Sequence, residues 1–370
     1  MVFRDSLLYA LAAGSVVFAH HEPRTGKEFE AQRALRATAY HCAPAVAEFT
    51  AARQRLWAQK VLSGGNPQLP GYDLFPETYG DHDQEQIADK EFWNSSISST
   101  IAPVVTEGPY YHIAGHPIRR NVAEYQLGLL TVRVEFYNYW YPFPLIDVET
   151  CKPLPNVLVD LWHANATGQY AGHPETVPQF KNVGEKIQIG GKTITMPPVY
   201  PRTKEEETWL RGAWPTDRNG VAQFTSPCNF VFLPPTNDSN LPRTAIFPGY
   251  YSTRATHIHA KVFTSWTPLP NGTFEAGNLA HTGQFFFDDG VNTQVDKMHP
   301  YTDNPIRHTE GRTRNSDDLG DLFQDSHENG YNPVFDAHLL GGILNQGLVA
   351  YITIGINASA SYDNSGWEGF

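Results

Sequence analysis

The sequence predicts a mainly β protein, an antiparallel β-sandwich that follows short N-terminal helices. From residue 129 onward, apolar residues alternate with a period of two inside runs rich in β-branched and aromatic residues, which is typical of strands. Turns containing Pro and Gly separate these runs at irregular spacing, and many short strands punctuated in this way favour a sandwich. The expected strands are residues 130–136, 157–162, 221–225, 257–263, 284–287 and 349–355.

The N-terminus has the pattern of a secretory signal. Residues 6–18 form an apolar run after Arg4, and this run is too short to span a bilayer. Val17 and Ala19 offer small residues for cleavage after position 19. A buried N-terminal helix is the alternative interpretation. We expect secretion to the extracellular space with loss of residues 1–19.

Helices and loops are expected before the sandwich. Helical composition over 27–41 predicts one helix, and Pro44 can begin a second that runs to about residue 62. Residues 66–100 are rich in Gly, Pro, Asp and Ser, which predicts a linker. The chain is therefore divided into a signal peptide (1–19), helices and linker (20–100), a sandwich domain (101–360) and a tail (361–370).

Composition excludes some classes of function. The 370-residue chain has a formal net charge of -12, which argues against nucleic acid as a partner. After the signal, no apolar run reaches the length of about 18 residues that a membrane span needs, so we expect no membrane partner. An aromatic content of 13% is enough for a large core with aromatic pocket walls.

Cysteines and glycosylation sequons fit an oxidising compartment. One disulfide plus one free thiol is the simplest outcome for three cysteines, and we expect Cys42 to pair with Cys151, leaving Cys228. We expect the side chain of Asn165 to cap a turn rather than to carry a glycan. The Asn-x-Ser/Thr sequons are Asn94, Asn165, Asn237, Asn271 and Asn357.

The most informative stretch runs from Pro248 to His259. In a strand, His257 and His259 point to one face and Ile258 points to the other. Imidazole is a common metal ligand, and a nearby tyrosine could bind a strong Lewis acid as phenolate. Histidine pairs on a strand also occur as packed or surface residues, so the pair alone leaves both interpretations open.

A second stretch, residues 157–170, is an apolar strand followed by a turn that contains Gly168 and ends on Tyr170. Its pattern Asp-x-Trp-x-Ala-Asn-x-x-Gly-x-Tyr, the later Pro-Gly-x-Tyr and the Arg-x-x-His-x-His together resemble the intradiol ring-cleavage dioxygenases. The secreted fungal branch is the most similar, and its core is similar to protocatechuate 3,4-dioxygenase and catechol 1,2-dioxygenase. The resemblance covers roughly residues 101–360. Four further segments resemble the family: 106–111, 210–212, 216–220 and 283–288. Segments 210–212 and 216–220 are expected in the turn between the two tyrosines.

The resemblance implies a ferric ion held by two tyrosines and two histidines. Two tyrosinates and two neutral imidazoles would bring two negative charges to the metal and favour Fe(III) over Fe(II). Tyr251 rather than Tyr250 is implied, because the family has one residue between Pro-Gly and the ligand. The implied ligands are Tyr170, Tyr251, His257 and His259.

The resemblance also implies an activity and further catalytic residues. The enzyme would cleave a catechol-type ring between its two hydroxylated carbons with O2 and yield muconic-type acids. Tyr251 would accept a substrate proton, and Arg254 would stabilise negative charge on the ring. Gln284 would lie beside it. Plain alternatives are a salt bridge for Arg254, a structural hydrogen bond for Gln284, and core packing for Trp162 and Tyr110.

Two competing functions remain open. Cleavage after Ala19 would expose His20, which could bind copper through its amine and ring. A non-catalytic secreted module could use the same fold to bind phenolics or wall polymers. No basic residue is clearly placed for a substrate carboxylate, which favours catechol or hydroxyquinol over protocatechuate. A homodimer is left open.

Several other residues carry weaker expectations. The segments 172–207 and 227–243 lengthen the path between the two tyrosines and are interpreted as pocket-covering loops, and 301–332 is also interpreted as a loop. Five further histidines are interpreted as surface or satisfied core residues and are not assigned to the metal: His112, His116, His163, His281 and His299.

Overall fold

The protein is described by a computed structural model that covers most of the expected sandwich domain. The longer described stretches are residues 116–124, 131–135, 145–173, 206–217, 245–251, 253–318, 331–339 and 348–362. Shorter described pieces are 41, 42, 44, 104, 105, 108, 110–112, 126, 186–189, 192–195, 220, 222–224, 323, 324, 326, 343, 344 and 364. The expected signal peptide, linker and segment 227–243 lie outside these residues. So do the two expected leading helices, except that His41, Cys42 and Pro44 are helical.

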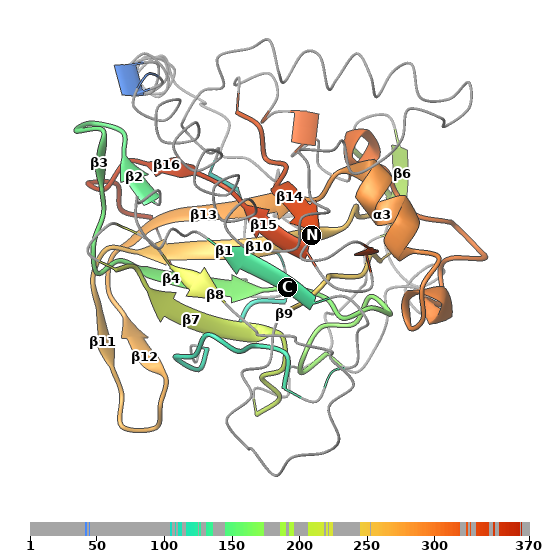
Figure 1. Ribbon diagram of the computed structural model, residues 1–370, viewed down its shortest axis with the longest axis horizontal. Helices are drawn as coiled ribbons and strands as arrows, with labels where there is room; N and C mark the ends of the chain where they lie inside the picture. Colours follow the sequence, from blue (N-terminus) through green and yellow to red (C-terminus); the bar gives the residue numbers. More distant parts are fainter. Residues whose placement is uncertain are drawn as a thin grey trace, which may run out of the picture.

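Two sheets form the body of the domain (Figure 1). The first sheet has the order β13–β10–β4–β7 and is antiparallel throughout. Its strands are β13 (Leu279–Phe286), β10 (His257–Phe263), β4 (Leu158–Trp162) and β7 (Arg211–Pro215). The second sheet has the order β14–β15–β1–β8, with β9 also paired to β1. Its strands are β14 (Asp336–Leu339), β15 (Leu348–Tyr351), β1 (Thr131–Glu135), β8 (Gln223–Phe224) and β9 (Ala245–Ile246).

The hydrophobic core lies between these two sheets. One cluster of buried side chains joins Val159, Ile258 and Val262 of the first sheet to Phe224 and Leu348 of the second. Burying a side chain such as Ile258 or Val262 stabilises the fold by about 1.5 to 3 kcal/mol. The alternation along β10 therefore fixes that strand firmly against the second sheet.

The other face of the first sheet is polar, yet it is also buried. His257, His259 and Lys261 alternate with the core residues of β10 and are at most 2% exposed. Residues paired directly across strands share a face, so Gln284 of β13 lies beside His259, and Asp160 of β4 lies beside Lys261. This arrangement gives the first sheet a layer of polar side chains removed from water. We call this layer the polar face.

Smaller elements surround the sandwich. A three-stranded sheet contains β16 (Ile354–Ile356), β2 (Leu145–Asp147) and β3 (Lys152–Pro153), and β11 (Trp266–Pro268) with β12 (Phe274–Ala276) forms a hairpin that projects from the body (Figure 1). A second hairpin consists of β5 (Lys186–Ile189) and β6 (Lys192–Thr195). The helical elements that follow β13 are α3 (Asp289–Val295), η2 (Tyr301–Asp303) and η3 (Asn315–Asp317).

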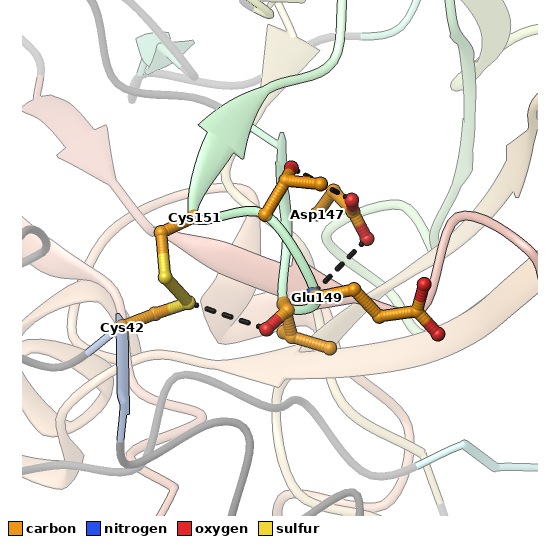
Figure 2. The surroundings of a disulfide bond; sticks show 6 residues. Cys42, Asp147, Glu149 and Cys151 are labelled. Atoms are coloured by element: carbon orange, nitrogen blue, oxygen red, sulfur yellow. Dashed lines mark hydrogen bonds between the residues drawn. A yellow bond between two sulfur atoms is a disulfide. The ribbon is translucent and has the colours of Figure 1, made fainter.

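A disulfide joins Cys42 to Cys151, as the sequence analysis expects (Figure 2). The bond connects residues 109 positions apart. Cys151 directly precedes β3, in a turn where the Asp147 carboxylate accepts hydrogen bonds from Glu149 N and Thr150 Oγ1. The leading segment is thereby tied to the three-stranded sheet.

The predicted mainly β fold class is confirmed, with differences in detail. Strand 257–263 has the predicted bounds, and 130–136 and 157–162 correspond to β1 and β4. The expected strand 349–355 is wrong as a single strand, because Ile352 and Thr353 interrupt it and β15 and β16 enter different sheets. The pairs β1–β15 and β16–β2 run parallel, so the sheets are not purely antiparallel.

Three segments interpreted as turns or loops contain regular structure. Arg211–Pro215 is strand β7 rather than part of a turn between the tyrosines, and Leu210 before it has a positive φ of 57°. Segment 172–207 contains the β5–β6 hairpin, and 301–332 contains η2 and η3. Among the described residues, no helix is long and apolar enough to cross a membrane.

Removing the disulfide should lower stability substantially. Cys151→Ser is expected to reduce the free energy of unfolding by about 2 to 5 kcal/mol. Without the bond the unfolded chain has more conformational entropy than the cross-linked chain, and this gain is large because the disulfide closes a long loop. Chemical denaturation of wild type and variant measures this difference. The matched control is Cys228→Ser, which removes the cysteine left over from the pair. Equal losses in both variants would contradict a structural role for the bond.

His281 should make stability depend on pH. It pairs with Val262 on the core face of β13, and burial lowers its pKa to about 3. Below pH 6.5 the unfolded chain binds a proton that the folded chain does not, so acid should destabilise the fold by about 1.4 kcal/mol per pH unit. His281→Leu should remove this increment between pH 6 and 4, measured by denaturation of both proteins in parallel. An unchanged slope of unfolding free energy against pH would contradict it.

Candidate metal centre and active site

Four donor atoms converge on one point beside the polar face. His257 Nε2 lies 2.9 Å from His259 Nε2, 3.3 Å from Tyr251 Oη and 3.4 Å from Tyr170 Oη. The two phenol oxygens are 3.4 Å apart. All four side chains are at most 7% exposed. The structure thus brings together the four residues that the sequence motifs single out.

Tyr170 is delivered by a tightly bonded turn after β4. Asn165 Oδ1 accepts hydrogen bonds from Thr167 N, Thr167 Oγ1 and Gln169 N, each 3.0 Å long. Asn165 therefore caps the turn, as expected from its position in the motif. Gly168 has a φ of +81°, a conformation that favours glycine. The turn is rigid at the point where it presents the phenol.

The turn that carries Tyr251 is locked onto the first turn. Gly249 N donates to Asn165 O at 3.1 Å, and a Cβ on Gly249 would lie 2.2 Å from that same oxygen. A Cβ on Gly168 would in turn lie 2.4 Å from Tyr250 O. The two turns can approach so closely only because both Gly168 and Gly249 lack a Cβ atom. The Pro-Gly-x-Tyr pattern and the Gly of the first motif are thus parts of one contact, which fixes Tyr170 relative to Tyr251.

The two histidines are held in their neutral form. The Ala255 carbonyl can only accept, so His257 Nδ1 carries the proton of their 2.6 Å hydrogen bond and Nε2 keeps its lone pair. His259 stacks on Trp162, with ring centroids 4.8 Å apart and planes inclined by 5°. Its Nδ1 is buried and has no hydrogen-bond partner among the described residues. Burial, followed by the charge of Arg254, lowers the pKa of both imidazoles well below the usual 6.5.

The donor set fits a hard, strongly charged metal ion. Burial raises the pKa of Tyr251 above 10 and that of Tyr170 well above it, so both phenols need a strong nearby cation to lose their protons. Donor separations of 2.9 to 3.4 Å are those of atoms about 2 Å from one ion with angles of about 90° to 115°. Among the described residues, no three His, Cys, Asp or Glu side chains form a metal site. The tyrosines are therefore essential to any site here.

Aromatic side chains enclose the ligands. Tyr110 stacks on Tyr170 with centroids 4.3 Å apart and meets Tyr251 edge-on at 5.8 Å. Tyr110, Trp162 and both ligand tyrosines belong to one buried cluster. Tyr110 and Trp162 thus contact ligand rings directly, beyond the core role that the sequence left open.

Arg254 connects the donor cluster to a polar network. Its Nη1 lies 3.5 Å from Tyr251 Oη, and its Nη2 donates to Gln284 Oε1 at 2.6 Å. Arg254 thus lies beside a donor tyrosine, and it also forms a salt bridge with Asp318. Burial disfavours the charged guanidinium, but the carboxylate of Asp318 and the phenol of Tyr251 outweigh burial and raise the pKa of Arg254 above its usual value.

Asp318 is a residue of this site that sequence reasoning missed. Its side chain is fully buried and forms the salt bridge with Arg254, at 3.1 Å between Oδ1 and Nε. It follows η3, in the segment interpreted only as a polar loop. A lone Asp among many polar residues carries no periodic or motif signal that would single it out.

The other histidines differ from each other. His299 is exposed and lies 3.2 Å from Asp303, in line with a surface residue. His112, His116, His163 and His281 are buried. His116 Nδ1 lies 2.5 Å from Asp160, whose other oxygen accepts from Tyr111 Oη at 2.9 Å, so His116 is a satisfied core residue. The copper alternative depends on His20, which lies outside the described residues.

No protein-family model matches the chain, and no curated protein matches it. Solved structures do match. An intradiol ring-cleavage dioxygenase from Tetranychus urticae is 22% identical, with a TM-score of 0.47 over 71% of this chain and 98% of that one. A catechol 1,2-dioxygenase from Pseudomonas arvilla C-1 is 15% identical, with a TM-score of 0.35 over 74% of this chain and 67% of that one.

A hydroxyquinol 1,2-dioxygenase from Pseudomonas putida DLL-E4 is also 15% identical, with a TM-score of 0.30 over 82% of this chain and 83% of that one. These proteins carry the names of the family that the sequence motifs resemble.

Loss of a ligand should remove the metal. His259→Ala is expected to lose iron and visible colour together, because one of four donors and the stacking on Trp162 disappear. Tyr170→Phe should weaken iron binding and shift the visible absorption that ferric tyrosinate produces. Metal analysis and absorption spectra of purified proteins measure both effects, with the exposed His299→Ala as control. One copper per wild-type chain, or full iron in His259→Ala, would contradict the assignment.

Proposed function

We propose that this chain is a secreted ferric dioxygenase that cleaves catechol-type rings between their two hydroxylated carbons. The observation that carries the proposal is that His257 Nε2 lies 2.9 to 3.4 Å from His259 Nε2, Tyr251 Oη and Tyr170 Oη, while the two phenol oxygens are 3.4 Å apart. Two phenolates and two neutral imidazoles match ferric iron better than zinc or ferrous iron. When bound, the ferric ion supplies a strong Lewis acid that draws electron density from a chelated catechol and makes a ring carbon reactive toward O2.

Tyr251 is the proposed acceptor of a substrate proton. A catechol would have to lose two protons to bind as a dianion, and the Tyr251 phenolate would be a suitable base. Arg254 Nη1 lies 3.5 Å from Tyr251 Oη, which supports a role of this guanidinium beside the phenol that would take the proton. As the ring loses aromaticity, the same positive charge would stabilise the developing negative charge.

The buried aromatic cluster would hold the ring and exclude water. Tyr110, Trp162 and the ligand tyrosines pack together with little exposure. A fixed ring next to fixed donors lowers the entropy lost in reaching the transition state. The overall reaction adds both atoms of O2 to the ring and yields a muconic-type diacid, with no other oxidant or reductant.

Catechol or hydroxyquinol is the preferred substrate class. Two buried cations of the polar face already have protein partners: Arg211 donates to Ala171 O at 2.9 Å, and Lys261 donates to Asn364 Oδ1 at 2.5 Å. These bonds engage Arg211 Nη2 and the Lys261 ammonium, which favours an uncharged ring over a carboxylated ring such as protocatechuate. Extracellular localisation is supported by the signal-like N-terminus, the sequons and the Cys42–Cys151 disulfide.

Oxygen uptake on a panel of catechol, hydroxyquinol and protocatechuate tests the proposal. The iron-loaded protein should consume one O2 per ring and open the bond between the hydroxylated carbons. Arg254→Ala should keep iron and colour but lower kcat by about a hundredfold, as removal of one oxyanion-type donor does. Arg307→Ala, which removes a partly exposed arginine beside Asp296, is the matched control.

The outcomes separate the competing functions. Cleavage of the bond beside the diol would rule out the intradiol reaction. A protein that binds iron and catechol but consumes no O2 with any ring would be the non-catalytic binding module. Wild-type turnover by Arg254→Ala would remove that residue from the chemical step.

A further inference from the structure

We infer that Asp318 is a positioning residue that fixes the guanidinium of Arg254 with Nη1 toward the ligand Tyr251. The inference rests on the proposed function, since it assigns to the same site a residue that controls the proposed catalytic arginine. Asp318 is 3% exposed and comes from a segment 64 residues beyond Arg254.

Both carboxylate oxygens of Asp318 are fully used. Oδ1 accepts from Arg254 Nε at 3.1 Å and from Ala255 N at 2.6 Å. Oδ2 accepts from Arg254 Nη2 at 3.2 Å and from Gln284 Nε2 at 3.2 Å. The two oxygens of an ionised carboxylate can accept these four hydrogen bonds. A side chain that donates, such as an amide, would face donor groups at this position.

These bonds determine which edge of Arg254 faces the metal centre. The guanidinium is planar, so fixing Nε and Nη2 also fixes Nη1. Nη1 is the nitrogen that lies 3.5 Å from Tyr251 Oη. Without the carboxylate, nothing else described holds Nε, and the side chain would regain rotational freedom.

Gln284 is the second part of the same clamp. Its Oε1 accepts from Arg254 Nη2 at 2.6 Å, so its Nε2 has to face Asp318. Gln284 is therefore fixed by two partners and cannot turn its amide without placing two donors together. It stands on β13 directly opposite His259, which connects the clamp to a ligand-bearing strand.

The segment that delivers Asp318 is anchored to the end of β13. Asn315 Nδ2 donates to Phe287 O at 2.8 Å, and Asn315 N donates to Asp289 Oδ2 at 3.2 Å. Arg312 forms an ion pair with the same Asp289 at the start of α3. Asp318 is thus held at a fixed place relative to Gln284 by contacts that do not involve the metal.

A double-mutant cycle tests whether Asp318 acts through Arg254. Asp318→Asn places an amide against donor groups and should lower kcat by about 10- to 100-fold, as loss of supporting residues around metal sites does. Iron content and colour should be retained. In the Arg254→Ala background the same substitution should have little further effect, because the residue that it positions is absent. Equal losses of kcat in both backgrounds would overturn the inference.

A charge-relocating pair provides a rescue. In Asp318→Asn/Gln284→Glu the carboxylate moves to position 284, where it can accept hydrogen bonds from Arg254 Nη2 and from the side-chain amide introduced at position 318. The side-chain oxygen at position 318 can still accept the hydrogen bond from Arg254 Nε. This pair should recover most of the kcat lost in Asp318→Asn. A merely structural role would give no recovery, and a double variant as slow as Asp318→Asn would overturn the inference.

Two further measurements keep the inference separate from its premise. Asp147→Asn alters a buried carboxylate in the three-stranded sheet (Figure 2), and should lower stability without changing kcat. A crystal structure of iron-loaded Asp318→Asn should show Arg254 turned away from Tyr251, whether or not any catechol is cleaved. If no catechol is cleaved by wild type, the proposed function fails. If Arg254 keeps its orientation in Asp318→Asn, the positioning role fails by itself.

Discussion

Strand β10 has to satisfy two environments at once, and the rest of the molecule depends on how it does so. Ile258, Ala260 and Val262 enter the core between the sheets, while His257 and His259 point to the opposite face and supply two of the four donor atoms. A slip of one residue would exchange the two sets and bury imidazoles in the apolar core. Pairing with β13 on one side and β4 on the other prevents this slip. Sandwich stability and ligand geometry are therefore set by the same register.

The polar face is stable because its charges have partners in the protein. Asp160 bonds to His116 and Tyr111, and Asp318 bonds to Arg254. A buried charge left without a partner is strongly destabilising, whereas a fully bonded network is rigid. Rigidity is what a site needs to hold donors in place before a substrate arrives. The same network restricts the substitutions that the polar face can accept.

The sequence was most informative where periodicity and side-chain type agreed. Alternation defined the bounds of β10, and the two tyrosine motifs singled out side chains that the structure brings together. The interruption at Ile352 was hidden because apolar residues continue through it. Asp318 could not be predicted, since its importance comes from contacts 64 residues away. The interlock of the tyrosine turns was likewise visible only in three dimensions.

The contact between the turns at Gly168 and Gly249 joins two parts of the chain that are far apart in sequence. Tyr170 and Tyr251 are separated by 81 positions, yet their turns touch directly through the backbone, in addition to the support that β7 gives to β4. Insertions that leave β7, β8 and β9 intact need not move a donor atom, because the contact at the two glycines does not pass through them. Grafting segments at such places is therefore a way to vary what surrounds the donor atoms while their spacing is kept.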